Sequence, residues 1–71
     1  MIFKTFNSST LHQMVYDEET KVLEVTFKRG AVYRYSNVPE GIVDELLNAK
    51  SAGKYFNGNI AKIFKYEKIG G

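Results

Sequence analysis

The chain has 71 residues and no cysteine, so we expect one small domain without disulfides, thiolate nucleophiles or cysteine-based zinc sites. It is 44% hydrophobic and 25% charged with a net charge of +2, which argues against general disorder and does not demand a polyanionic partner. No apolar run approaches the length of a membrane span, so we expect a cytoplasmic protein that does not enter a membrane.

The N-terminal segment is predicted to be an edge strand or a loose end. Residues 1–6 alternate weakly between apolar and polar side chains, which fits an edge strand. The polar run at 7–10 predicts a turn after it. The alternative is that residues 1–7 are only loosely attached to the domain.

A second strand is predicted at residues 11–16. Strict alternation would place Leu11 on the opposite face from Met14 and Tyr16. A β-bulge near His12 returns all three apolar side chains to one face. We therefore expect a bulge in this strand.

The clearest strand signal lies at residues 21–28. Residues 17–20 carry side chains that hydrogen-bond locally, which predicts the turn before it. Leu23, Val25 and Phe27 then alternate with more polar residues. This pattern is typical of a strand with one buried face.

The turn after this strand sets the register of the next one. A two-residue loop would place both following tyrosines beside polar side chains. A three-residue loop ending in Gly30 at positive φ pairs Val25 with Tyr33 and Leu23 with Tyr35. Because the second register gathers the apolar side chains on one face, we predict that one.

A helix is predicted to begin near Pro39. Proline sets its own φ and suits the first turn of a helix. Ile42, Val43, Leu46 and Leu47 then recur at helical spacing, with charged residues between them. We expect this helix to cover the sheet.

The last third of the chain is less regular. Ser51–Gly53 is expected to break the first helix, and a second helical face is expected between residues 54 and 64. Residues 64–69 then fit a final strand or an extended tail, and residues 70–71 fit a loose end. The residues of the second helical face are Tyr55, Phe56, Ile60, Ile63 and Phe64.

These elements predict an α+β fold. A small antiparallel sheet of three to four strands is covered by one helix and a short second helical segment, all within a single domain spanning 1–71. The predicted core is made of Leu11, Met14, Tyr16, Leu23, Val25, Phe27, Tyr33, Tyr35, Val38, Ile42, Val43, Leu46, Leu47, Tyr55, Phe56 and Ile60.

A series of short motifs, in order and spacing, is similar to a known family. The motifs are Ser8-Ser9-x-Leu11, Tyr16-Asp17, Leu23-x-Val25-x-Phe27-x-x-Gly30, Tyr33-x-Tyr35, Val38-Pro39 and Ala49-x-Ser51-x-Gly53-x-Tyr55-Phe56-Asn57, followed by Ile60. Together they cover roughly residues 7–66 and resemble the KTSC domain, named after the C-terminal region of lysyl-tRNA synthetase. Val15 departs from the pattern, which has a small residue, often glycine, at this position.

The resemblance implies a free-standing bacterial or phage form of this domain. No activity is established for the family, and RNA binding has been suggested for it from its attachment to a synthetase. An attachment is an association and not a mechanism, so the residues themselves must carry the functional argument.

The sequence contains no set of residues arranged for catalysis. His12 is the only histidine and has no partner for a usual zinc site. Six of the eight acidic residues fall on one turn (17–19) or one helix face (Glu40, Asp44 and Glu45), where they do not oppose each other across a cleft. We therefore expect no enzyme activity, no cofactor and no metal.

The sharpest functional signal is a mixture of basic and aromatic residues, which is typical of proteins that hold single-stranded nucleic acid. We hypothesise a small non-catalytic module that binds RNA or single-stranded DNA. The alternative is a module that binds a protein partner or associates with itself through a sheet edge. The residues assigned to nucleic-acid binding are Lys28, Arg29, Arg34, Lys54, Lys62 and Lys65.

Overall fold

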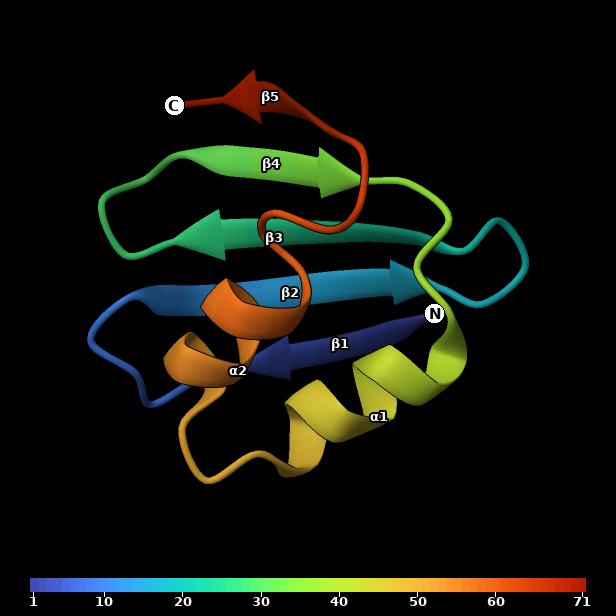
Figure 1. Cartoon of the computed structure of the whole chain (residues 1–71). Helices are drawn as coiled ribbons and strands as arrows, with labels where there is room; N and C mark the ends of the chain where they lie inside the picture. Colours follow the sequence, from blue (N-terminus) through green and yellow to red (C-terminus); the bar gives the residue numbers. More distant parts are fainter.

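The computed structural model describes residues 1–71 as an antiparallel sheet of five strands with two helices (Figure 1). The strands lie side by side in chain order, and both helices lie between the fourth and fifth strands in the sequence. The predicted α+β class is confirmed, with five strands in place of three to four. The elements are β1 (Ile2–Thr5), β2 (Leu11–Asp17), β3 (Val22–Phe27), β4 (Val32–Tyr35), α1 (Glu40–Asn48), α2 (Ala52–Asn59) and β5 (Tyr66–Gly70).

The two ends of the chain account for the larger strand count. β1 pairs with β2 over its whole length, and β5 pairs with β4. Gly70 is the last residue of β5. Gly71 has a positive φ of 83°, and a Cβ added to it would lie 2.5 Å from the Cα of Ala31. Of the terminal residues for which looseness was considered, residues 2–5 and Gly70 are therefore paired in the sheet, whereas Met1 is 82% exposed.

The predicted strand details are confirmed. The pairing of β2 with β3 shifts register between Leu11 and Gln13, which is the expected bulge. Val25 is opposite Tyr33 and Leu23 is opposite Tyr35, as the three-residue loop requires. Gly30 has a positive φ of 102°, a conformation that glycine adopts without steric cost.

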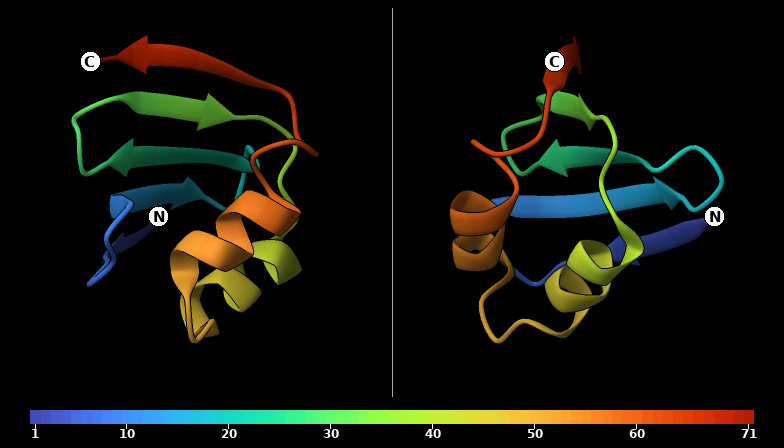
Figure 2. Two further views of the ribbon diagram at one scale, coloured as in Figure 1. Left: turned by 60° about the vertical axis from the view of Figure 1, so that its left-hand side comes forward. Right: turned by 45° about the vertical axis from the view of Figure 1, so that its right-hand side comes forward.

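Both helices pack on one side of the sheet and leave the other side open (Figures 1 and 2). Eleven buried residues form a single core cluster on the covered side, and every one of them was predicted. The other five predicted core residues are partly buried and pack against this cluster. Neither helix is long and apolar enough to cross a membrane.

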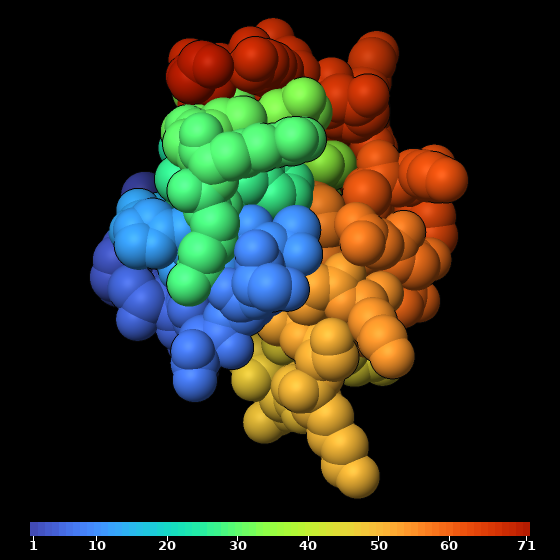
Figure 3. Space-filling view, turned by 90° about the vertical axis from the view of Figure 1, so that its left-hand side faces the viewer, coloured from blue at the N-terminus to red at the C-terminus, as the bar shows by residue number.

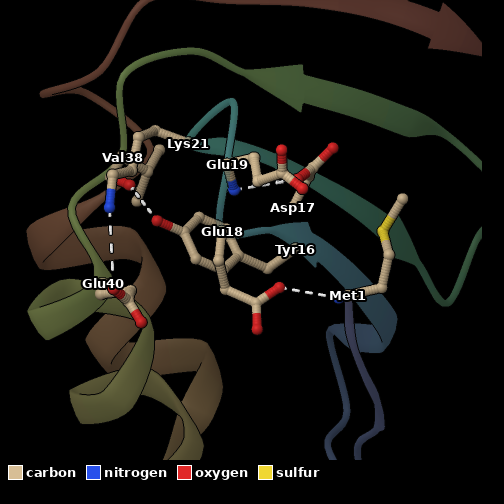
Figure 4. A network of polar contacts seen from close by, with 8 residues as sticks. All are labelled: Met1, Tyr16, Asp17, Glu18, Glu19, Lys21, Val38 and Glu40. Atoms are coloured by element: carbon tan, nitrogen blue, oxygen red, sulfur yellow. Dashed lines mark hydrogen bonds and ion pairs between the residues drawn. The ribbon is translucent and has the colours of Figure 1, made fainter.

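Tyr16 ties the sheet to the segment that leads into α1. Its side chain is fully buried, and its hydroxyl donates a hydrogen bond of 2.6 Å to the carbonyl oxygen of Val38 (Figure 4). Nearby, the amino group of Met1 contacts Glu18 at 2.7 Å and Lys21 contacts Glu40 at 3.6 Å. This end of the molecule is therefore rich in carboxylates, and its cations are paired with them.

The second helix differs from the prediction at both ends. The expected break between the helices includes Ser51, which is extended and caps α2, since its Oγ accepts a hydrogen bond from the backbone N–H of Lys54. Ala52 and Gly53, which were expected to belong to the break, already lie in α2. The helix ends at Asn59, so Ile63 does not belong to its apolar face and is 64% exposed. The prediction continued the helical face to Phe64, whereas the helix ends five residues earlier.

Candidate nucleic-acid interface

Three tyrosines from the last two strands of the sheet gather on its helix-covered side. The register places Tyr66 of β5 opposite Tyr35 of β4. The ring of Tyr66 lies 5.5 Å from that of Tyr33 in a stacked arrangement and 5.5 Å from that of Tyr35. Because the sheet brings the three rings together, they form one aromatic surface.

Two phenylalanines continue this aromatic surface toward α2. The ring of Phe27 lies edge-on to Tyr33 and Phe56, at 5.5 Å from each. Phe56, which projects from α2, also meets Tyr35 edge-on at 5.4 Å. Helix α2 therefore anchors one side of the aromatic surface through Phe56.

A hollow of about 340 Å³, here called the aromatic groove, opens over these rings. It is lined by Phe27, Tyr33, Tyr35, Phe56 and Tyr66 together with small and polar residues and two cations. No acidic residue lines it. The volume is at the lower end of the range for small-ligand sites, and the aromatic wall suits a planar group such as a base.

The tyrosines of the groove differ in exposure. Tyr35 is 2% exposed and belongs to the core, Tyr33 is half-buried, and Tyr66 is 53% exposed. Burial, followed by the neighbouring Tyr66 and Tyr33, raises the pKa of Tyr35 to about 12. The inward orientation predicted for Tyr35 is confirmed, and Tyr66 is the ring left available to a ligand.

Two of the predicted cations, Arg29 and Lys62, line the aromatic groove. Arg29 comes from the β3–β4 turn and Lys62 from the segment after α2, and both are exposed. Arg29 also lines an adjoining hollow of about 370 Å³, here called the hairpin hollow. The hairpin hollow is bounded by Ser9, Thr10, Lys28 and Arg29.

The other predicted cations are dispersed. Arg34 lies on the open side of the sheet, where Nε contacts Glu24 and Nη1 contacts Glu67, each at 3.2 Å. Lys54 is exposed on α2, and Lys65 is exposed in the segment before β5, but neither lines the aromatic groove or the hairpin hollow. The structure therefore brings together Lys28, Arg29 and Lys62 and separates Arg34 from them.

The cations that surround the groove are not engaged in ion pairs. The ion pairs of the molecule involve the N-terminal amino group, Lys21 and Arg34, so Lys28, Arg29 and Lys62 remain available to an anion. No group of three or more histidine, cysteine or acidic side chains is arranged to hold a metal ion. The aromatic groove and its cations can therefore bind a ligand that combines a planar ring with a negatively charged group.

Comparison with known proteins agrees with this architecture. A family model described as the KTSC domain matches residues 7–64. The chain belongs to the KTSC domain family. It superimposes on the crystal structure of a KTSC domain protein from Yersinia pestis with a TM-score of 0.89 and 33% identity, covering 97% of both chains.

Two relatives differ in the share of their length that this chain matches. An uncharacterised protein from Stutzerimonas stutzeri is 50% identical over 50 residues, which are 70% of each chain. A lysine–tRNA ligase from Nostoc punctiforme is 38% identical over 61 residues, which are 86% of this chain and 11% of the ligase. The family model and the structural neighbour indicate no catalytic family.

The first KTSC motif has a clear structural role beside the groove. The Oγ of Ser8 accepts hydrogen bonds from the backbone N–H groups of Thr10 and Leu11, at 3.1 and 3.3 Å, and so shapes the β1–β2 loop. A Cβ at Gly53 of α2 would lie 3.5 Å from this oxygen, so the loop and the helix are in close contact. Figure 3 shows the face on which the β1–β2 loop (blue), the β3–β4 turn (green) and α2 (orange) meet.

Proposed function

We propose that this KTSC domain binds single-stranded nucleic acid at the aromatic groove, with a base against Tyr66 and phosphates at Lys28, Arg29 and Lys62. The observation that carries the proposal is an aromatic hollow lined by two unpaired cations and by no carboxylate. A base stacked on an aromatic side chain contributes about 1–3 kcal/mol, and the contribution tolerates any base. The proposed activity is binding, without catalysis.

The charge distribution supports an anionic ligand at this end of the molecule. The chain has eight acidic residues, and none of them lines the aromatic groove or the hairpin hollow. Glu24 and Glu67 are on the open side of the sheet, paired with Arg34. A phosphate backbone therefore approaches the groove without meeting a carboxylate on the hollows' walls.

A single strand fits the groove better than a duplex. Bases in a duplex are stacked on one another, so their faces are not free to meet Tyr66. Some relatives of the domain are named lysine–tRNA ligases, which supports RNA as the first ligand to test. Such a role also fits the cytoplasmic location that the sequence led us to expect.

The proposal is tested by fluorescence anisotropy with labelled oligouridylate and oligothymidylate at low salt. We expect Tyr66→Ala to weaken binding by roughly 5- to 150-fold, the equivalent of one lost stack. Tyr66 is half-exposed, so the variant should remain folded, which circular dichroism checks. Lys21→Gln should bind as the wild type does, because Lys21 lies outside the groove and is paired with Glu40.

The salt dependence gives an independent readout. With three phosphate contacts, the logarithm of the binding constant should fall by about 2 for each tenfold rise in salt concentration, since each contact on a single strand contributes about 0.7. Titrations that stay flat with both oligonucleotides at low salt would refute the proposal. Equal affinity of Tyr66→Ala and the wild type would refute the role given to the groove.

A second candidate is self-association through the edge of the sheet. β5 pairs with β4 on one side only, and its exposed residues include Ile69. An unprotected edge strand is a common site of pairing with another chain. Light scattering measures the molecular mass in solution and so distinguishes the two candidates. A stable dimer in the absence of nucleic acid is expected only if the chain associates through the sheet edge.

A further inference from the structure

A third hollow, of about 470 Å³, lies between the β1–β2 loop and the connection from α1 to α2. Two lysines line it: Lys4 from β1 and Lys50 from the connection. Neither forms an ion pair, and no acidic residue lines the hollow. We call it the lysine hollow.

Two hydroxyl groups of the lysine hollow are available as hydrogen-bond donors. The Oγ atoms of Ser8 and Ser51 accept hydrogen bonds from backbone N–H groups, which leaves both hydroxyl hydrogens available. Both serines line the hollow beside the two lysines. Cations and hydroxyl donors without a carboxylate favour an anion with several oxygen atoms, such as a phosphate.

The lysine hollow adjoins the hairpin hollow, which in turn adjoins the aromatic groove. Ser9 lines both the lysine hollow and the hairpin hollow. Thr10 and Arg29 line both the hairpin hollow and the aromatic groove. The three hollows therefore form a track around the β1–β2 loop, on the face where that loop, the β3–β4 turn and α2 are adjacent (Figure 3).

We propose that the lysine hollow binds phosphate groups of the same strand whose base is held at Tyr66. The strand then runs from the aromatic groove past Arg29 and over the β1–β2 loop to Lys4 and Lys50. This inference rests on the proposed nucleic-acid function and adds the path and length of the bound strand. A dinucleotide occupies only the groove, whereas a longer strand also reaches the lysines.

The experiment compares an oligouridylate of about two nucleotides with one of about eight, within the range of strand lengths that small single-strand-binding folds cover. The wild type should bind the longer strand more tightly and with a steeper salt dependence. Lys4→Gln and Lys50→Gln should each reduce the salt slope for the longer strand by about 0.7. Neither should change binding of the dinucleotide.

Lys21→Gln is the control, since it removes one positive charge at the acidic end of the molecule. Thermal unfolding of each variant shows that the fold is retained. If the longer strand binds but Lys4→Gln and Lys50→Gln behave like Lys21→Gln, the path is overturned and the proposed function stands. If neither strand binds the wild type, both are overturned.

Discussion

The hydroxyl of Tyr16 offers a sharp test of how the sheet is joined to the segment before α1. Tyr16→Phe removes one oxygen from a fully buried side chain and leaves the carbonyl of Val38 without its 2.6 Å partner. An unsatisfied buried acceptor costs about 1–3 kcal/mol. A domain of this size has a total stability of about 4–11 kcal/mol, so the loss is a large fraction of it.

The assay is equilibrium unfolding in urea followed by circular dichroism. We expect the free energy of unfolding to fall by about 2 kcal/mol with an unchanged slope, and the melting temperature to fall by about 8–16 °C. Tyr33→Phe is the matched control, because Tyr33 is half-buried and its hydroxyl makes no hydrogen bond within the protein. A change below about 0.5 kcal/mol for Tyr16→Phe would refute the reasoning.

Two further predictions concern charge. Because the pKa of Tyr35 is raised to about 12 in the folded chain from about 10 in the unfolded one, folding favours the protonated phenol. The contribution of Tyr35 to the free energy of unfolding should therefore be constant below about pH 10 and be lost between about pH 10 and 12. Tyr35→Phe should reduce the fall in stability over that range, and an identical pH profile in urea titrations would contradict this. Arg34→Gln should leave oligonucleotide affinity unchanged, because Arg34 is paired with Glu24 and Glu67. Arg29→Gln should weaken binding and reduce the salt slope by about 0.7, because Arg29 lines the aromatic groove. Equal effects of the two variants in anisotropy titrations would contradict the assignment.

Local patterns in the sequence predicted the centre of the fold well. The bulge in β2 and the register of β3 with β4 follow from period-two alternation and from a glycine at the one turn position that needs positive φ. A one-residue error in either place would have moved a whole set of apolar side chains to the wrong face. Because the predicted bulge and register were both right, the buried side chains were assigned to the correct face of the sheet.

The alternation in β4 also indicates the side of the sheet on which Arg34 lies. Arg34 lies between Tyr33 and Tyr35 in β4, so its side chain must point to the opposite face from theirs. The prediction grouped Arg34 with Arg29 because both flank the hairpin in the sequence. The structure separates them, and strand geometry alone could have done so.

The remaining site residues depend on contacts between distant parts of the chain. Tyr66 joins the aromatic surface only because β5 pairs with β4 in a register that places it opposite Tyr35. Lys4 and Lys50 line the same hollow because the α1–α2 connection folds back beside β1 and the loop that follows it. Neither juxtaposition leaves a periodic pattern in the sequence.

The most direct test of the central claim is a ¹H–¹⁵N NMR titration of the labelled domain with a short oligouridylate at low salt. The account predicts shift changes centred on Arg29, Lys62 and Tyr66, which decrease as salt is added. It would be contradicted by unchanged spectra, or by shift changes confined to the open side of the sheet around Val22, Glu24 and Arg34.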